Sequence, residues 1–438
     1  MIGLPVSIQS LINTVVNMVD TFMIGSLGDD YVSAVGLANK VFFVLNLLIF
    51  GIGSGCSVLL SQYYGKRDDK NLNRTFGFMM ALSLIGSFIF FILAVSIPGA
   101  LMRIFTESEA LITIGSSYLR IVSVSYVFTA FSMSVGAMLR SINKTRAPMI
   151  FTIISVFINV FFNFIFIFGK MGAPVMNADG AAIGTIIARF VEFLCILFYL
   201  IFAKKDVKLE IKEIVHINKE TIKKNLKFAL PVIVNEVGWG LGTTMYSVIY
   251  GHMGDEVVAS MTIATALEDL VYALLFGVST ACAVIVGNQL GSNDLEKAEK
   301  SAVKLLISGI VLSAGLAGIL VLVVNPYIML YKTTEVVASN IRKVCIAYAI
   351  MMPARTFNLI MIVGILRSGG DTLFCMIMEL TCLWGIGVSL GAIGAFLLNL
   401  DVLWVFVLCE TEQLVKVLIG FIRYRQKKWV KNIVIKDI

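Results

Sequence analysis

Long apolar stretches separated by short polar segments recur along the whole chain. Each is near the roughly 20 residues that a helix needs to cross a hydrocarbon core about 30 Å thick. Apolar and polar positions do not alternate within them, which excludes the short alternating strands of a transmembrane β-barrel. The pattern predicts an all-α polytopic membrane protein with twelve transmembrane helices, at about residues 2–24, 34–62, 76–97, 113–139, 147–168, 180–203, 228–250, 258–288, 302–324, 341–366, 373–397 and 402–422.

The composition agrees with this pattern. The chain has 438 residues, of which 58% are hydrophobic and 14% charged, whereas soluble proteins have about 25% charged residues. There are two histidines, His216 and His252, so a His-based metal centre is excluded. The sequence contains no GxSxG elbow and no Walker GxxxxGK[ST] motif. We therefore expect neither an enzyme nor a cofactor, and any uphill transport must be driven by an ion gradient.

The basic residues predict the orientation in the membrane. The connections near residues 65, 140, 203, 291 and 367, with the tail from 423, hold 25 of the 35 Lys and Arg, and the alternate connections hold 5. Both termini are therefore expected in the cytoplasm. This asymmetry accounts for the net charge of +7, so no nucleic-acid partner is needed.

Three further expectations concern basic residues. The tail segment 423–429 is typical of an interfacial anchor on anionic lipid. Lys40 and Lys416 lie near span ends and are expected to extend to the membrane surface. Because Lys40 is also the first basic residue, we expect a short basic leader to precede this sequence.

The chain contains two copies of one unit. At an offset of 226 residues, Leu4-Pro5-Val6 recurs as Leu230-Pro231-Val232, Gly28-Asp29 as Gly254-Asp255, and Gly65 as Gly291. An even number of spans per copy gives both the same orientation, with substrate handled near mid-depth by alternating access. The alternative is an ancestral duplication in a channel or scaffold. The predicted organisation is an N-lobe (1–203), a cytoplasmic linker (204–227), a C-lobe (228–424) and a basic tail (425–438).

A stripe of polar residues lies on one face of the first helix. Gln9, Asn13, Asn17 and Asp20 follow one another at intervals of three or four. A charged Asp at the bilayer centre costs roughly 2.5–3.5 kcal/mol on insertion scales, so this face must line a cavity or meet polar partners. The alternative is that the stripe only holds helices together.

The fifth and sixth spans offer partners for Asp20. Ser155, Asn159 and Asn163 share one face of the fifth span, and the sixth carries Thr185. A carboxylate with amide and hydroxyl oxygens suits Na⁺, and the same carboxylate can carry a proton instead. Arg189 and Glu192, three residues apart, are expected to pair with each other.

The second half carries acidic residues and one arginine within its spans. They are Glu236 in the seventh span, Glu268 and Asp269 in the eighth, and Arg355 and Asn358 in the tenth. This set is interpreted as either a site for a cationic substrate or an internal network of ion pairs.

Several motifs together resemble the multidrug and toxin extrusion (MATE) transporters. They are Val19-Asp20-Thr21 with Gly25-Ser26-Leu27-Gly28, Gln62-Tyr63-Tyr64-Gly65, Gly180-Ala181-Ala182-Ile183-Gly184-Thr185, and Leu366-Arg367-Ser368-Gly369-Gly370-Asp371-Thr372. The likeness covers essentially the whole chain. It implies two pseudo-symmetric six-helix lobes in a V, and export of cationic or amphipathic compounds in exchange for Na⁺ or H⁺.

The resemblance also implies a cation site in the N-lobe. Carried over position by position, it consists of Asp20, Asn159, Asn163 and Thr185, with Na⁺ possible at Asp20. Some branches have a second acid where Asn163 stands. Other branches use a Glu of the seventh helix and an Asp of the tenth, but Glu236 falls about a turn earlier and the tenth span offers Arg355.

The resemblance leaves other functions open. Flippases for lipid-linked saccharide precursors share the architecture, and a membrane-embedded enzyme is a third hypothesis. The expected partners are small cationic or amphipathic molecules and membrane lipid. We expect a monomer in the bacterial cytoplasmic membrane.

Overall fold

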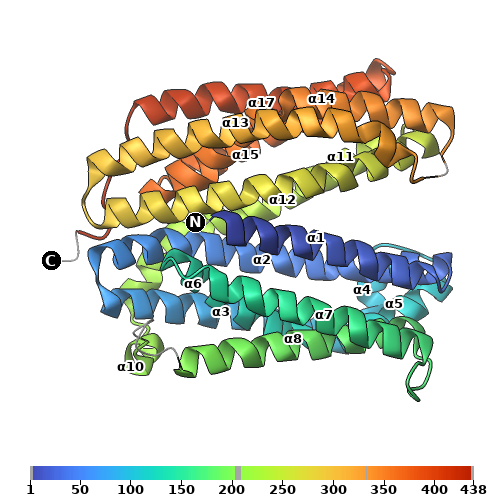
Figure 1. Ribbon diagram of the computed structural model, residues 1–438, viewed down its shortest axis with the longest axis horizontal. Helices are drawn as coiled ribbons and strands as arrows, with labels where there is room; N and C mark the ends of the chain where they lie inside the picture. The colour runs from blue at the N-terminus through green and yellow to red at the C-terminus, as the bar shows by residue number, and fades with distance from the viewer. Residues whose placement is uncertain (1–2, 203–208, 332, 436–438) are drawn as a thin grey trace. The chain divides into compact units, whose positions relative to one another are not determined.

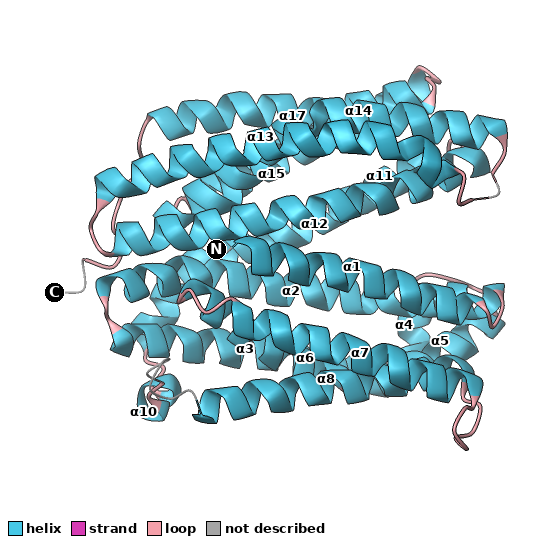
Figure 2. Ribbon diagram, viewed as in Figure 1, coloured by secondary structure: helices cyan, strands magenta, loops and turns pink. Residues whose placement is uncertain are grey.

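The computed structural model describes residues 3–202, 209–331 and 333–435. In these ranges the regular elements are helices joined by short loops, with no strand (Figure 2). The predicted all-α class is therefore confirmed.

Twelve long helical segments follow one another in the described part of the chain (Figure 1). Each corresponds to one predicted span, although many extend beyond the apolar stretch. They are α1 (Gly3–Gly25), α2 (Asp29–Lys66), α3 (Asp69–Ser96), α5 (Glu109–Val122) with α6 (Ser125–Ser141), α7 (Arg146–Phe168), α8 (Asn177–Phe202), α11 (Lys219–Gly251), α12 (Asp255–Gly291), α13 (Leu295–Ile328), α14 (Glu335–Leu359) with η1 (Ile360–Leu366) and η2 (Arg367–Gly369), α15 (Thr372–Cys382) with η3 (Leu383–Val388), α16 (Ser389–Ala392) and η4 (Ile393–Leu397), and α17 (Val402–Arg425). Two short helices, α4 (Pro98–Arg103) and α10 (Ile211–Val215), lie between them.

The long helices differ in how apolar they are. Eight are long and apolar enough to cross a membrane, and α5 with α6, bent by 51°, makes a ninth if the pair is one span. The other three, α1, α11 and α17, carry polar or charged residues between their apolar ones. Polar side chains within a membrane are costly unless they have polar partners. These three helices are therefore the strongest candidates to carry a functional site.

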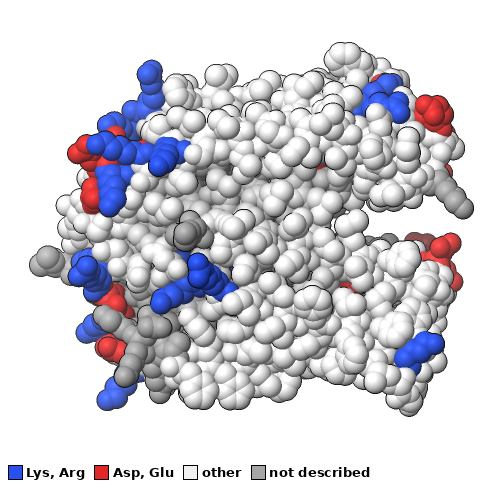
Figure 3. Space-filling model, in the orientation of Figure 1, with Lys and Arg blue, Asp and Glu red and all other residues white. Residues whose placement is uncertain are grey.

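The chain divides into two compact units, and the boundaries between them fall within α1, α2 and α11 and between α2 and α3. The first, called the N-terminal unit, consists of Ile8–Leu60 and Asp68–Ile233. The second, the C-terminal unit, consists of Met1–Ser7, Ser61–Arg67 and Val234–Ile438. In each unit, most of the Lys and Arg side chains visible in Figure 3 lie near one end of the helices, and a few lie near the other end.

The backbone repeats at the same offset of 226 residues as the sequence. Gly28 and Gly254 both precede a long helix with a positive φ, of 119° and 113°, a conformation that only glycine adopts readily. Asp68 caps α3 and Asp294 caps α13, each by accepting the backbone N–H three residues later. The two copies thus use identical devices to begin corresponding helices.

Two expectations are wrong, one for Lys416 and one for Trp429 of the tail. Lys416 does not extend to the surface, because it is buried and its Nζ lies 2.8 Å from Oε2 of Glu412. Arg367, at the start of the connection near residue 367, is also buried. In the tail, Trp429 is 1% exposed and packs in the core of the C-terminal unit rather than at a lipid interface. The ring of Tyr424 stacks on Trp429.

Candidate functional site

The helices α7 and α8 lie side by side in the N-terminal unit (Figure 1). Small residues at every fourth position of α8, Gly180, Gly184 and Ala188, allow this close approach. At Gly184 the approach is so close that an added Cβ would overlap Oδ1 of Asn163. The small-residue stripe of α8 therefore determines where the polar face of α7 lies.

The polar face of α7 meets Asp20 of α1. Nδ2 of Asn163 donates to Oδ1 of Asp20 at 2.9 Å. In the orientation that satisfies both ends of its amide, Asn159 donates to both Asp20 oxygens, at 3.0 and 3.1 Å, and accepts from the Thr185 hydroxyl at 3.3 Å. Asn159 and Asn163 are 7% and 1% exposed. The structure thus brings together all four residues of the predicted N-lobe cation site.

This group has one carboxylate and otherwise neutral oxygens. Rotation of the two amides would present their oxygens, in place of their nitrogens, to a cation bound at the carboxylate. The described residues contain no group of three or more His, Cys, Asp or Glu that could hold a metal. A single carboxylate with amide and hydroxyl oxygens therefore suits a monovalent cation or a proton better than a divalent metal.

The stripe on α1 has a second contact with α7, nearer the start of both helices. Nε2 of Gln9 donates to Oγ1 of Thr152 at 2.8 Å, and the Thr152 hydroxyl donates to Oε1 of Glu192 at 3.0 Å. Glu192 also forms an ion pair with Arg189 at 2.8 Å, which confirms that predicted pair.

The other two residues of the stripe are Asn13 and Asn17. Asn13 is half-buried, and the side chain of Asn17 lies outside the described part of the structure. The structure therefore places Gln9 and Asp20 in polar contacts at different depths of one unit.

In the C-terminal unit, Glu236 belongs to a buried ion pair. Its Oε1 accepts from Nη1 of Arg367 at 2.8 Å, and Nη2 of Arg367 lies 3.4 Å from Oε2 of Glu379. The amide of Asn235 also donates to Glu379 at 2.7 Å. Arg367 and Glu379 were not among the predicted site residues. The sequence signal that could have identified them is a charged residue inside or at the end of an apolar span, because such a residue requires a partner of opposite charge.

Arg355 of the tenth span is also held by its own chain. Its guanidinium makes a two-pronged ion pair with Glu410, with Nε at 2.6 Å from Oε2, and lies over the ring of Tyr348. Oε2 of Glu268 is 4.0 Å from Nη1 of Arg355. These contacts are those of an internal network of ion pairs, one of the two interpretations of this set. Glu410 was missed for the same reason as Glu379.

Two predicted residues lie apart from that network. Asp269 is exposed. Asn358 turns to α17, where its amide donates to the backbone oxygen and to Oε1 of Gln413, at 2.8 and 2.9 Å. The five C-lobe candidates therefore do not form one site.

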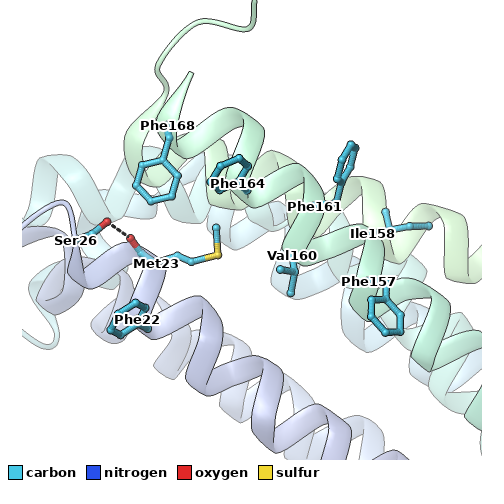
Figure 4. A pocket seen from close by; sticks show the side chains of 9 residues that line it. All are labelled: Phe22, Met23, Ser26, Phe157, Ile158, Val160, Phe161, Phe164 and Phe168. Carbon is cyan, nitrogen blue, oxygen red and sulfur yellow. Dashed lines mark hydrogen bonds between the residues drawn. The ribbon is translucent and has the colours of Figure 1, made fainter. Parts of the chain in front are cut away.

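A hollow of about 770 Å³ lies between the end of α1 and α7. Its lining is almost wholly apolar and rich in phenylalanine (Figure 4); it consists of Phe22, Met23, Ser26, Phe157, Ile158, Val160, Phe161, Phe164 and Phe168. The hydroxyl of Ser26 is turned to the backbone oxygen of Met23, at 2.7 Å. Aromatic faces such as these can accommodate apolar groups and can attract organic cations. Sequence reasoning did not identify this hollow.

Known proteins resemble this chain over nearly its whole length. An uncharacterized transporter, YisQ of Bacillus subtilis, is 24% identical over 98% of this chain and 94% of its own. A probable multidrug resistance protein, NorM of Thermotoga maritima, is 25% identical over 99% and 93%.

A solved structure shares the fold. A MOP superfamily transporter from Pyrococcus furiosus, described as having a binding pocket of reverse polarity, has a TM-score of 0.88 at 20% identity and covers 98% of this chain and 94% of its own. The model of the MatE family matches residues 5–165 and 231–393, one stretch in each copy of the repeat. The chain therefore belongs to the MatE family.

Proposed function

We propose that this protein is a cation-coupled exporter of cationic or amphipathic small molecules, driven by Na⁺ or H⁺ through alternating access. The observation that carries the proposal is the half-buried carboxylate of Asp20, which lies beside two amides and a hydroxyl of its own unit. Membership of the MatE family supports it, as does the likeness to a relative described as a probable multidrug resistance protein.

The residues around Asp20 suit a site that is filled and emptied in each cycle. The amide groups of Asn159 and Asn163 can donate to the empty carboxylate or, after rotation, present oxygens to a cation. The same two amides can therefore hold the carboxylate when the site is empty and coordinate a cation when it is filled, without a resident metal. A bound ion shifts the balance between two conformations only by its different affinity for each.

The phenylalanine-lined hollow offers a place for the apolar part of a substrate. It involves Phe22 and Met23, which lie within one turn of Asp20 on α1. An amphipathic cation can thus contact the aromatic rings while its charge competes with the coupling ion.

The test is dye efflux from proteoliposomes under separately imposed Na⁺ and H⁺ gradients. We expect one of the two gradients to drive efflux by the wild type, and Asp20→Asn to abolish it with normal amounts of folded protein. Asp30→Asn, which changes an exposed carboxylate of the same unit, serves as the matched control. Wild-type efflux by Asp20→Asn would refute the proposed site.

A further inference from the structure

The polar contacts of the N-terminal unit continue along α8 beyond the Asp20 shell, which consists of Asn159, Asn163 and Thr185. Thr185, which belongs to that shell, lies four residues before Arg189 on α8. Four residues are about one turn, or a rise of roughly 6 Å, so both side chains project from one face. The guanidinium of Arg189 pairs with Glu192 at 2.8 Å, and about one turn of α8 separates Arg189 from the residues around Asp20.

The two partners of this arginine are held differently. Glu192 is 5% exposed, and its oxygens accept from Thr152 at 3.0 Å and from Arg189 at 2.8 Å. The Thr152 hydroxyl is in turn held by Gln9. Arg189, by contrast, has a side chain that is 33% exposed. Glu192 is thus a fixed acceptor, whereas Arg189 has room to move.

We propose that Arg189 is an internal counter-cation that competes with the coupling ion for Asp20. It pairs with Glu192 while a cation or proton neutralises Asp20, and it turns toward Asp20 when that site empties. This inference rests on the proposed function and assigns to it a positioning residue that regulates ion affinity. A guanidinium suits the role because it stays charged and matches the geometry of a carboxylate.

The balance of charges supports the proposed change of partner by Arg189. Asp20 and Glu192 carry two negative charges against one positive charge on Arg189, which leaves one negative charge for one monovalent cation. Of the titratable side chains on neighbouring helices, Tyr118 of α5 and Tyr126 of α6 are uncharged at neutral pH, Lys40 of α2 is exposed, and Arg140 lies in the last turn of α6. Counting Asp20, Glu192 and Arg189 alone, one Na⁺ or one proton per cycle is the expected stoichiometry.

The test measures the cation concentration that gives half-maximal efflux in proteoliposomes, with Na⁺ and pH varied separately. Glu192→Gln removes the alternative partner of Arg189, so we expect the half-maximal concentration to rise about tenfold or more. Arg189→Gln removes the competitor, so we expect the half-maximal concentration to fall by a similar factor while maximal efflux slows. Arg189→Lys keeps the charge and is expected to stay near the wild type.

The control is Glu109→Gln, which changes an exposed ion pair with Arg103 at 3.2 Å in the same unit. It should leave the half-maximal concentration unchanged. If Glu192→Gln does not fold, the fall expected for Arg189→Gln, beside a half-maximal concentration near that of the wild type for Arg189→Lys, still tests the proposal. The proposed competition would be overturned if Glu192→Gln and Arg189→Gln left the half-maximal concentration unchanged or shifted it in the same direction. This holds for protein whose efflux still requires Asp20. Efflux that no longer requires Asp20 would overturn the proposed function.

Discussion

The packing of α8 against α7 makes Gly184 a sensitive point for ion affinity. Gly184 itself carries no functional group, but a methyl group there would overlap Oδ1 of Asn163. The change Gly184→Ala therefore acts on Asp20 through the amide that donates to it at 2.9 Å. It tests whether the position of the shell, and not only its composition, determines cation binding.

The expected magnitude follows from that contact. A hydrogen bond to a charged group contributes about 1.5–3 kcal/mol, and about 1.4 kcal/mol corresponds to a factor of ten in affinity. If the methyl displaces Asn163, the cation affinity should change by about 10- to 100-fold. If the helices separate instead, overpacking should cost about 1–3 kcal/mol of stability.

Two measurements separate these outcomes. The half-maximal cation concentration for efflux reports on the shell, and the midpoint of thermal unfolding in detergent reports on helix packing. Asn163→Ala should reproduce the first effect without overpacking. Gly36→Ala serves as the control, because a Cβ there meets nothing within 4 Å. Wild-type cation dependence in both Gly184→Ala and Asn163→Ala would refute the role of the shell.

Three further predictions concern stability and are checked by thermal unfolding in detergent. Gly65→Ala should destabilise the C-terminal unit, because a Cβ there overlaps the backbone oxygen of Asn288; a midpoint at or above that of the wild type would contradict this. Trp429→Ala should cost about 3–5 kcal/mol, because the ring is 1% exposed; a cost below about 1 kcal/mol would place the tail outside the core. Arg367→Met leaves the buried Glu236 and the half-buried Glu379 without their partner and should cost about 3–5 kcal/mol, whereas Lys300→Met, in an exposed ion pair, should change little.

The helices were predictable because the membrane imposes their length and composition. Each apolar stretch became a helix, but the ends differ: the second span was expected from residue 34, and α2 begins at Asp29. Helices continue past the apolar region wherever a polar residue can cap them, as Asp68 caps α3. Hydropathy marks the part of a helix that lipid surrounds and not its full extent.

The N-terminal shell was predictable from helical spacing together with the family resemblance, because its residues share faces of single helices. The buried charges of the C-terminal unit were not. Arg367 and Glu236 are 131 residues apart, and Arg355 and Glu410 are 55 apart. No periodicity within one helix reports such a pairing. A sequence can show that a buried charge needs a partner, but the choice of partner depends on tertiary packing.

The two copies of the repeat have come to differ in how they neutralise buried charge. In the C-terminal unit, Glu236 is paired with Arg367, and Glu410 is paired with Arg355. A mobile cation would have to displace a guanidinium that makes charge-assisted hydrogen bonds there, and breaking a buried pair is costly. Asp20 is instead held by neutral amides, and the guanidinium proposed to compete for it, that of Arg189, has a second partner in Glu192. Ion coupling is therefore expected to depend on Asp20 of the N-terminal unit, and Glu236→Gln should alter stability more than the dependence of efflux on the coupling ion.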